Sequence, residues 1–383
     1  MTSISGRSRP TTPPRSPGGN LYDDVFDTVI AETQDISERF EIDLGGVPDT
    51  IRETSQGVQP LLDYVRECLE THRLPPGQKS TRVARLVDVA AWVLRRSGEF
   101  AAHYCEGRVA AVDGTPLFHP RRYLSGQVFA VAVGALTARD ALQPRAKIVR
   151  TSIPMQLSAK AGTNAPDLVA TLERMAAQAH QMVLDTSWPQ AFLEYHVRRY
   201  ALEHVRAPYI LVDGPLAPEL VGTRRLGRDL LSQIFHDERV AIGVVKSLLR
   251  SPLVYRLIAR ALRPGEAYVV ESQRTFLRRS GTRLFGERWI DNELGTIWRG
   301  LYRPGAKTYA FQCRAQDFEA ALCLLWCDRD EVVGHELPFL LNQVDHQLQA
   351  RYRQGDIEQL LDGLLAEQGE DVFFDEMDER LLR

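Results

Sequence analysis

The first part of the chain shows a helical repeat of apolar positions. Leu61, Tyr64, Val65, Cys68 and Leu69 recur at three- and four-residue spacing, which predicts one face of an α-helix. Residues 75–77 (Pro-Pro-Gly) interrupt this pattern. A second helical repeat follows, and a helix is predicted from residue 80 through Val83, Leu86, Val89 and Val93. We therefore expect residues 21–106 to form a helical N-terminal region.

The pattern changes to short apolar runs after residue 107. Val109–Val112, Val128–Leu136 and Ala146–Ile153 follow closely along the chain and predict an antiparallel meander. Further strands are predicted at Tyr209–Val212, Val240–Val245, Tyr268–Val270, Trp298–Tyr302 and Thr308–Cys313, and helices at 166–184, Pro189–Arg206, Phe318–Trp326 and Leu340–Arg351. This alternation predicts an α/β fold with a mixed sheet and flanking helices.

Composition narrows the class of protein. The 383 residues are 44% hydrophobic with a net charge of −3, which is typical of a globular protein and excludes a collagen-like or wholly disordered chain. No apolar run approaches the roughly 20 residues of a membrane span, and the Pro- and Arg-rich residues 1–20 predict a flexible tail and no signal peptide. The five scattered cysteines indicate no disulfide framework and favour the reducing cytoplasm.

Two segments share the pattern of an apolar strand followed by Asp and Gly. Residues 109–114 read Val-Ala-Ala-Val-Asp-Gly, and residues 209–214 read Tyr-Ile-Leu-Val-Asp-Gly. A plain Asp-Gly turn is one interpretation. The other is a site, because α/β folds place ligands at the carboxyl ends of strands. If the two strands are neighbours, the carboxylates of Asp113 and Asp213 converge and need a cation, and Mg²⁺ or Mn²⁺ prefers such oxygen ligands. This ligand set suits metal-dependent phosphodiester hydrolysis.

A third carboxylate is expected from the helix predicted after residue 189. Glu194 and Glu203 are nine residues apart, which places them on opposite sides of a helix. Glu194 lies in line with Val197 and Ala201 on the apolar face, whereas Glu203 lies in line with His196 on the polar face. A Glu on an apolar stripe needs a partner, and a metal ion is one. We expect Glu194 to contribute to the site, and a half-buried Glu paired with Arg is the alternative.

The two Val-Asp-Gly segments, together with Ile242–Lys246 after the second, resemble the NurA nucleases. The resemblance covers roughly residues 105–352. NurA nucleases process DNA ends, have an RNase H-like core and work with the hexameric ATPase and DNA translocase HerA. Their C-terminal motif has an aromatic residue after Pro, followed by an acidic residue or His on a helix. It corresponds here to Pro338-Phe339 and Asp345-His346. The family often has Tyr where Phe339 stands.

The resemblance implies a set of site residues and partners. Mn²⁺ or Mg²⁺ would be bound by Asp113, Glu194, Asp213 and Asp345, with His346 as the alternative last ligand, and Lys246 would meet a phosphate or the transition-state charge. It also implies a nuclease domain over residues 107–352, a homodimer, a HerA-like ATPase partner, and 5′-to-3′ exonuclease and single-strand endonuclease activity. DNA-end resection and anti-phage defence both remain open as roles.

Basic residues with interleaved aromatics indicate where DNA could bind. The segment 274–307 combines such residues with Phe276, Phe285, Trp289, Trp298 and Tyr302, a composition that suits phosphate contacts and base stacking. The candidate DNA contacts are Arg224, Arg225, Arg274, Arg278, Arg279 and Arg283. A solvated basic face with its aromatics in the core is the alternative.

Three readings of function therefore remain: a HerA-associated nuclease, another RNase H-like phosphodiesterase without HerA, and a non-catalytic adaptor of the same fold. The strongly acidic segment 353–383 carries Phe373 and Phe374 among its charges. It is interpreted either as a solvated end or as a segment that docks on a partner or covers a groove.

Overall fold

The computed structural model describes most of the chain beyond residue 46. The described residues are 47–74, 85–89, 91, 97–123, 126–152, 187–223, 225–248, 251–279, 287–328, 338–352 and a few positions between 357 and 373. The expected tail 1–20, the helical pattern before residue 47 and the helix expected at 166–184 lie outside them. The chain divides into two compact units, Met1–Leu61 and Leu62–Arg383. Of the first unit the structure describes only part of helix α2 (Val47–Glu70).

The second unit is built on one mixed sheet. Its strand order is β1-β7-β8-β9-β6-β5-β2-β3-β4. The central strands β2, β5 and β6 are mutually parallel, and the other neighbours along this order pair antiparallel. The strands are β1 (Arg85–Asp88), β2 (Val109–Tyr123), β3 (Gly126–Thr137), β4 (Arg145–Ser152), β5 (Tyr209–Asp213), β6 (Val240–Val245), β7 (Glu266–Ser272), β8 (Ile297–Arg303) and β9 (Tyr309–Arg314). The order β4-β3-β2-β5-β6 is that of an RNase H-like core, and the expected α/β fold with a mixed sheet is confirmed.

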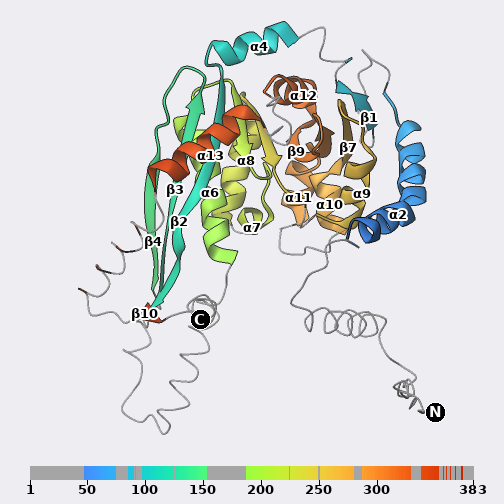
Figure 1. Ribbon diagram of the computed structural model, residues 1–383. Helices are drawn as coiled ribbons and strands as arrows, with labels where there is room; N and C mark the ends of the chain where they lie inside the picture. Colours follow the sequence, from blue (N-terminus) through green and yellow to red (C-terminus); the bar gives the residue numbers. More distant parts are fainter. Residues whose placement is uncertain are drawn as a thin grey trace, which may run out of the picture. The chain divides into compact units, whose positions relative to one another are not determined.

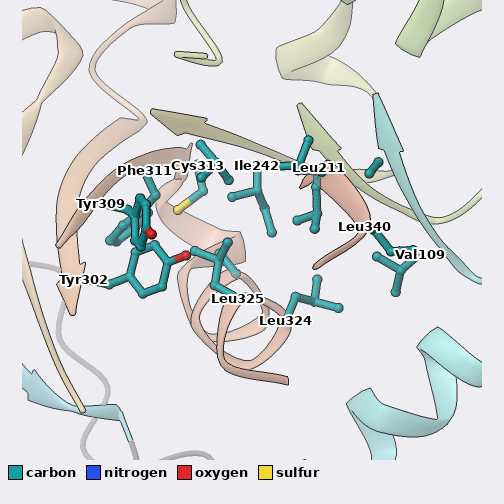
Figure 2. Packing of buried hydrophobic residues seen from close by; sticks show 14 of the residues in the cluster. Val109, Leu211, Ile242, Tyr302, Tyr309, Phe311, Cys313, Leu324, Leu325 and Leu340 are labelled. Carbon is teal, nitrogen blue, oxygen red and sulfur yellow. The ribbon is translucent and has the colours of Figure 1, made fainter. Parts of the chain in front are cut away.

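Helices cover both faces of this sheet (Figure 1). One face packs against α4 (Ser97–Cys105), α12 (Phe318–Cys327) and α13 (Phe339–Arg351). The opposite face packs against α6 (Ser187–His204), α7 (Glu219–Gly222), α8 (Arg225–His236), α9 (Leu253–Ala261), α10 (Gln273–Arg279) and α11 (Glu287–Glu293). Figure 2 shows how Val109, Leu211 and Ile242 of the parallel strands meet Leu324 and Leu340 on the first face.

Side chains along the parallel strands alternate between the two faces of the sheet, so each position packs against one helical layer. Ala110 and Val112 of β2 pack with Val197 and Ala201 of α6, whereas Ala111 is buried in the core under α12 and α13. Because side chains alternate between faces with a period of two, Asp113 lies on the same face as Ala111. The apolar pattern of each strand therefore directs its terminal polar residue toward α13.

The C-terminal end of α6 is fixed by Arg239, which follows the neighbouring turn. Its guanidinium donates to the carbonyl oxygens of Ala201, Leu202 and Val205, the groups that a helix leaves without internal partners. Asp237 accepts from the same guanidinium, with Nη2 at 2.6 Å. This contact holds α6 in place beside β5.

Two expectations about the elements were wrong. Within the helix expected from residue 80 to Val93, Arg85–Asp88 form strand β1, which pairs antiparallel with β7 and is buried at Arg85, Leu86 and Val87, whereas Val89 and Ala91 are helical. Consecutive buried residues suit a strand covered on both faces, and this tertiary contact overrides the helical spacing. Strand β2 does not end at Asp113 either, because it continues to Tyr123 along β3 while β5 stops pairing with it at Val112.

The acidic C-terminal segment contributes one short strand. β10 (Val372–Phe373) pairs antiparallel with Arg122 and Tyr123 at the far end of β2. Most of residues 353–383 lie outside the described part of the chain, so the two interpretations of this segment stay open.

Candidate active site

Three polar side chains come together where the parallel strands end. Asp113 lies on β2, Asp213 is the last residue of β5, and Lys246 directly follows β6. The residues two positions earlier are all buried in the core under α12 and α13, and they are Ala111, Leu211 and Val244. The period of two therefore puts all three polar side chains on one face of three adjacent strands.

Lys246 holds the two carboxylates together. Its Nζ lies 2.9 Å from Oδ2 of Asp113 and 3.2 Å from Oδ1 of Asp213. Burial lowers the pKa of Lys246, but the charges of Asp213 and Asp113 outweigh burial and raise this pKa above its usual range. The ammonium therefore stays protonated and contacts both carboxyl groups.

Asp113 is the more deeply buried member of the pair. Its side chain is 3% exposed, against 30% for that of Asp213, and its Oδ1 accepts a 2.6 Å hydrogen bond from the amide of Gly114. Burial and then the charge of Asp213 raise the pKa of Asp113 to about 8, although Lys246 opposes the shift. A carboxyl in this position gains from any additional positive charge.

The two Asp-Gly segments differ in backbone. Gly214 has φ of 79° and opens a turn, whereas Gly114 continues strand β2. A Cβ at Gly114 would lie 2.7 Å from Val197 and 2.8 Å from Leu193, so this glycine lets α6 approach the sheet. The interpretation as a plain turn therefore fits only the segment of Asp213 and Gly214. Gly114 instead allows close packing of α6.

Arg198 of α6 anchors the turn after Asp213, and the sequence analysis did not single it out. The side chain is fully buried at 1% exposure. Its Nη2 donates to the carbonyl oxygens of Asp213, at 3.0 Å, and Pro215, and its Nη1 donates to that of Glu194 at 3.2 Å. Burial lowers the pKa of Arg198, whereas the charges of Glu194, Asp213 and Asp113 raise it. Its position four residues after Glu194, on the same helix face, was the signal available in the sequence.

Glu194 lies in the second turn of α6, and its charge acts on Arg198 along with those of Asp213 and Asp113. Its carboxylate is half-buried and accepts a 2.9 Å hydrogen bond from Gln190. Glu203 instead forms an exposed 2.7 Å ion pair with Arg199. Glu194 is thus half-buried and Glu203 exposed, as their positions on opposite sides of the helix predict.

His196 departs from the predicted polar face of α6. It is buried, and its ring centroid lies 4.1 Å from that of Phe192. Burial lowers the pKa of His196 to about 4, so the imidazole is neutral at pH 7. The sheet side of α6 is wider than the apolar residues alone indicate, because β3 and β4 extend past the parallel strands.

Asp345 and His346 lie on α13, which packs across β2 and β3. Asp345 is half-buried, accepts a 2.9 Å hydrogen bond from Gln349 and adds to the charges that raise the pKa of Lys246. His346 is exposed. Of the two, Asp345 is the residue whose charge acts on Lys246, the partner of both aspartates.

The aspartate pair is the part of the site best suited to a metal ion. Within the described residues, no group of three His, Cys, Asp or Glu side chains lies close enough to share an ion, so Glu194 and Asp345 are not gathered with the aspartates. The aspartate pair itself fits a divalent cation. Both carboxylates already converge on one positive group, and Oδ1 of Asp213 is buried with the Lys246 ammonium 3.2 Å away but accepts no well-aligned hydrogen bond from the described residues. Hard cations prefer such carboxylate oxygens.

Two of the six candidate DNA contacts form ion pairs with acidic residues. Arg278 pairs with Asp291, and Arg279 pairs with the buried Glu271 at 2.6 Å. The aromatics Phe276, Trp298 and Tyr302 are buried in the core and are not available for stacking. Arg225 is exposed and Arg274 half-exposed, whereas Arg224, Arg283 and Phe285 lie outside the described residues.

Comparison with known proteins gives matches only among solved structures. No protein-family model matches the chain, and no curated protein matches it. The NurA nuclease of Sulfolobus solfataricus is 11% identical with a TM-score of 0.44, over 84% of this chain and 97% of that one. A NurA structure bound to dAMP and manganese is 8% identical with a TM-score of 0.42, over 80% and 93%. Endonuclease V of Bacillus subtilis is 13% identical with a TM-score of 0.32, over 64% and 82%.

The structures to which the chain is similar thus include NurA nucleases, the family that its motifs resemble. These superpositions are partial, and the site is defined by its own geometry. Among the described helices, none has both the length and the apolar character that a membrane span requires.

Proposed function

We propose that the protein is a metal-dependent deoxyribonuclease that hydrolyses DNA phosphodiester bonds at ends or in single strands. The observation that carries the proposal is the convergence of Asp113 and Asp213 from adjacent parallel strands on the ammonium of Lys246, 2.9 and 3.2 Å away. When both carboxylates are ionised, the single charge of Lys246 leaves one negative charge uncompensated, and the side chain of Asp213 is 30% exposed.

Each site residue has a role in this proposal. Asp113 and Asp213 would hold Mn²⁺ or Mg²⁺, with Glu194 and Asp345 as further ligands and His346 as the alternative to Asp345. When bound, the ion supplies Lewis-acid activation of the phosphate and of the attacking water. Lys246 neutralises a phosphate oxygen or the charge that develops in the transition state. Arg198 is a positioning residue, because it holds the backbone on both sides of Gly214.

DNA is proposed to approach along exposed basic side chains. Arg225 at the start of α8 and Arg274 on α10 have no acidic partner among the residues that the structure describes. Arg278 and Arg279 are exposed but form ion pairs, and Arg224 and Arg283 complete the candidate set. Phosphate contacts of this kind give affinity without sequence preference.

The finer assignments follow from the family resemblance. We propose a homodimer that works in the cytoplasm with a HerA-like hexameric ATPase, in DNA-end resection or anti-phage defence. The nuclease domain would extend over residues 107–352, after the N-terminal region 21–106, with 1–20 and 353–383 as terminal segments. The activity would be of the 5′-to-3′ exonuclease and single-strand endonuclease type. An RNase H-like phosphodiesterase independent of HerA shares the same carboxylates.

A non-catalytic adaptor is the second candidate. It is favoured by one observation, the absence from the described residues of three metal-ligating side chains close enough to share an ion. In that case the Asp113–Lys246–Asp213 contact would only hold the parallel strands together, and the protein would assemble with its ATPase without cutting DNA.

A nuclease assay separates these functions. Linear duplex and single-stranded DNA are incubated with Mn²⁺, with Mg²⁺ or with EDTA, each with and without a HerA-type ATPase. The nuclease proposal expects metal-dependent cleavage that falls by roughly 100-fold or more in Asp213→Ala and is retained in the matched surface variant Asp229→Ala. Equal cleavage by the native protein and Asp213→Ala contradicts the site. No cleavage under any condition, with an intact complex, favours the adaptor.

A further inference from the structure

A groove lies at the opposite end of the parallel strands from the carboxylates. It has a volume of about 480 Å³ and is bounded by residues at the amino ends of β2 and β5, the end of β3 and the last turn of α6. Because β2 and β5 are parallel, Arg108 and Pro208 lie at one edge of the sheet, and Asp113 and Asp213 at the other. The groove is therefore separate from the candidate active site.

Part of the groove's lining consists of small residues, and we call the alanines among them the alanine floor. Ala110, Ala135 and Ala207 line it, together with Gly107. Gly107 has φ of 73°, a backbone conformation that favours glycine. The volume lies in the range of about 300–1,000 Å³ that small-molecule sites occupy. A space of this size, lined in part by alanine and glycine, suits a ligand with a flat apolar part.

The rim of the groove is basic. Arg108, His204 and Arg206 line it. Arg206 is exposed and has no acidic partner among the described side chains. Arg108 has only a 3.9 Å contact with Glu106. Burial and then the charge of Arg145 lower the pKa of His204, against the charge of Glu203, and Arg206 acts in the same direction as Arg145. An anion would meet two guanidinium groups here, the side chains best suited to phosphate.

The groove also contains negative groups. Asp140 lines it, and its carboxylate accepts a 2.9 Å hydrogen bond from Thr137 while keeping its negative charge. The C-terminal carbonyl oxygens of α6, which would otherwise repel an anion, accept hydrogen bonds from Arg239. Tyr200 donates to the carbonyl oxygen of Gln143 at 2.6 Å and so fixes one wall. The two arginines of the lining, Arg108 and Arg206, outnumber its one carboxylate, that of Asp140, so the lining has a net positive charge.

We propose that this groove binds a phosphate-bearing ligand of nucleotide size, with its phosphate on Arg108 and Arg206 and its flat part against the alanine floor. The phosphate can belong to a free nucleoside monophosphate or to one nucleotide of a DNA strand. This binding does not depend on the proposed hydrolysis, because the groove shares no residue with the carboxylate pair.

Binding is measured in EDTA, which keeps phosphates from a metal at the carboxylates. Calorimetry with AMP tests the free nucleotide, and fluorescence anisotropy with a short single-stranded oligonucleotide tests the strand. The variants are Arg108→Ala/Arg206→Ala and Ala207→Leu, which fills the floor without changing charge. Arg256→Ala/Arg260→Ala on the exposed face of α9 is the matched control, and melting temperatures check that each variant folds.

Loss of AMP binding by tenfold or more in both groove variants, with the control unchanged, supports the site with a free nucleotide as ligand. The same losses seen only with the oligonucleotide support it with the strand as ligand. The proposal is overturned if neither probe binds the native protein, or if both bind the groove variants as tightly as they bind the control. A protein that lacks nuclease activity can still give the first two results, so the two proposals fail separately.

Discussion

The ammonium of Lys246 lies 2.9 Å from Oδ2 of Asp113, a carboxylate whose side chain is 3% exposed. Asp213 shares the same ammonium at 3.2 Å. If both carboxylates are ionised, the three groups carry a net negative charge in a setting where water screens little. We therefore expect the contact between Lys246 and Asp113 to affect the free energy of unfolding and the change in melting temperature on addition of a divalent cation.

Replacing Lys246 by Met should destabilise the protein and increase its response to metal. Removal of the ammonium leaves Asp213 without its ion-pair partner and Asp113 without its hydrogen-bond donor, which should lower the free energy of unfolding by about 1–3 kcal/mol. Mn²⁺ should then raise the melting temperature of the variant more than that of the native protein. Lys147→Met, at an exposed position of β4, is the control. Equal Mn²⁺ responses in all three proteins would show that no ion binds between the aspartates.

Asp113 should give the stability a characteristic pH dependence. Burial and the charge of Asp213 raise its pKa to about 8, so the folded state holds the proton more tightly than the unfolded state. The resulting stabilisation is complete below the unfolded pKa of about 4 and is lost as the pH rises through about 8.

Asp113→Asn removes this titration. Its unfolding free energy should vary less between pH 5 and pH 8 than that of the native protein, and at pH 8 the variant should be the more stable by about 1–3 kcal/mol. Urea denaturation at both pH values, with Asp229→Asn as an exposed control, measures the difference. Parallel curves for the native protein and Asp113→Asn would refute the raised pKa.

The strand pattern was sufficient to predict where Asp213 and Lys246 lie. Each follows a short apolar run whose buried residues alternate in register with those of its parallel neighbour. That Asp113 belongs with them also followed from the repeated Val-Asp-Gly pattern. Its place inside a longer strand did not, because continuation of β2 depends on the partner β3, and pairing with a distant strand is not encoded in local apolar spacing.

Other features needed the folded chain. The segment of strand β1 has a helical spacing of apolar residues, but its backbone pairs antiparallel with β7 and so forms part of the sheet. Arg198 resembles any helix arginine in the sequence, and only the turn at Gly214 gives it buried carbonyl partners. The pairing of Arg278 and Arg279 with acidic residues of other elements was likewise hidden, because charge spacing along one segment says nothing about distant partners.

Glu194 should matter far more than Glu203 for DNA cleavage. Glu194 is half-buried in the second turn of α6, and its charge acts on Arg198 together with those of the two aspartates, whereas Glu203 forms an exposed ion pair in the last turn. If Glu194 supports the metal, Glu194→Gln should lower the rate of Mn²⁺-dependent cleavage by about 10–100-fold, and Glu203→Gln should change it little. Equal effects of the two matched substitutions would remove Glu194 from the site.

Arg198 should be required for the integrity of the turn that carries Asp213. Arg198→Met leaves the partly buried carbonyl oxygens of Asp213 and Pro215 without these donors, which should cost about 2–4 kcal/mol of stability. Arg199→Met, the next residue, removes only an exposed pair with Glu203 and should cost at most about 0.5 kcal/mol. Chemical denaturation measures both, and comparable losses would show that Arg198 is not an anchor.

DNA affinity should depend most on basic residues that lack an internal partner. Each phosphate contact contributes a slope of about −0.7 for single-stranded DNA in a plot of log affinity against log salt concentration. Arg225 and Arg274 have no acidic partner in the described part of the chain, so Arg225→Ala and Arg274→Ala should each make the slope shallower by about that amount. Arg278 is neutralised by Asp291, and Arg278→Ala should leave the slope nearly unchanged. Anisotropy titrations at several salt concentrations test this order. A larger change for Arg278→Ala than for the other two would mean that DNA displaces Asp291 and that the basic segment after residue 274 is the main contact.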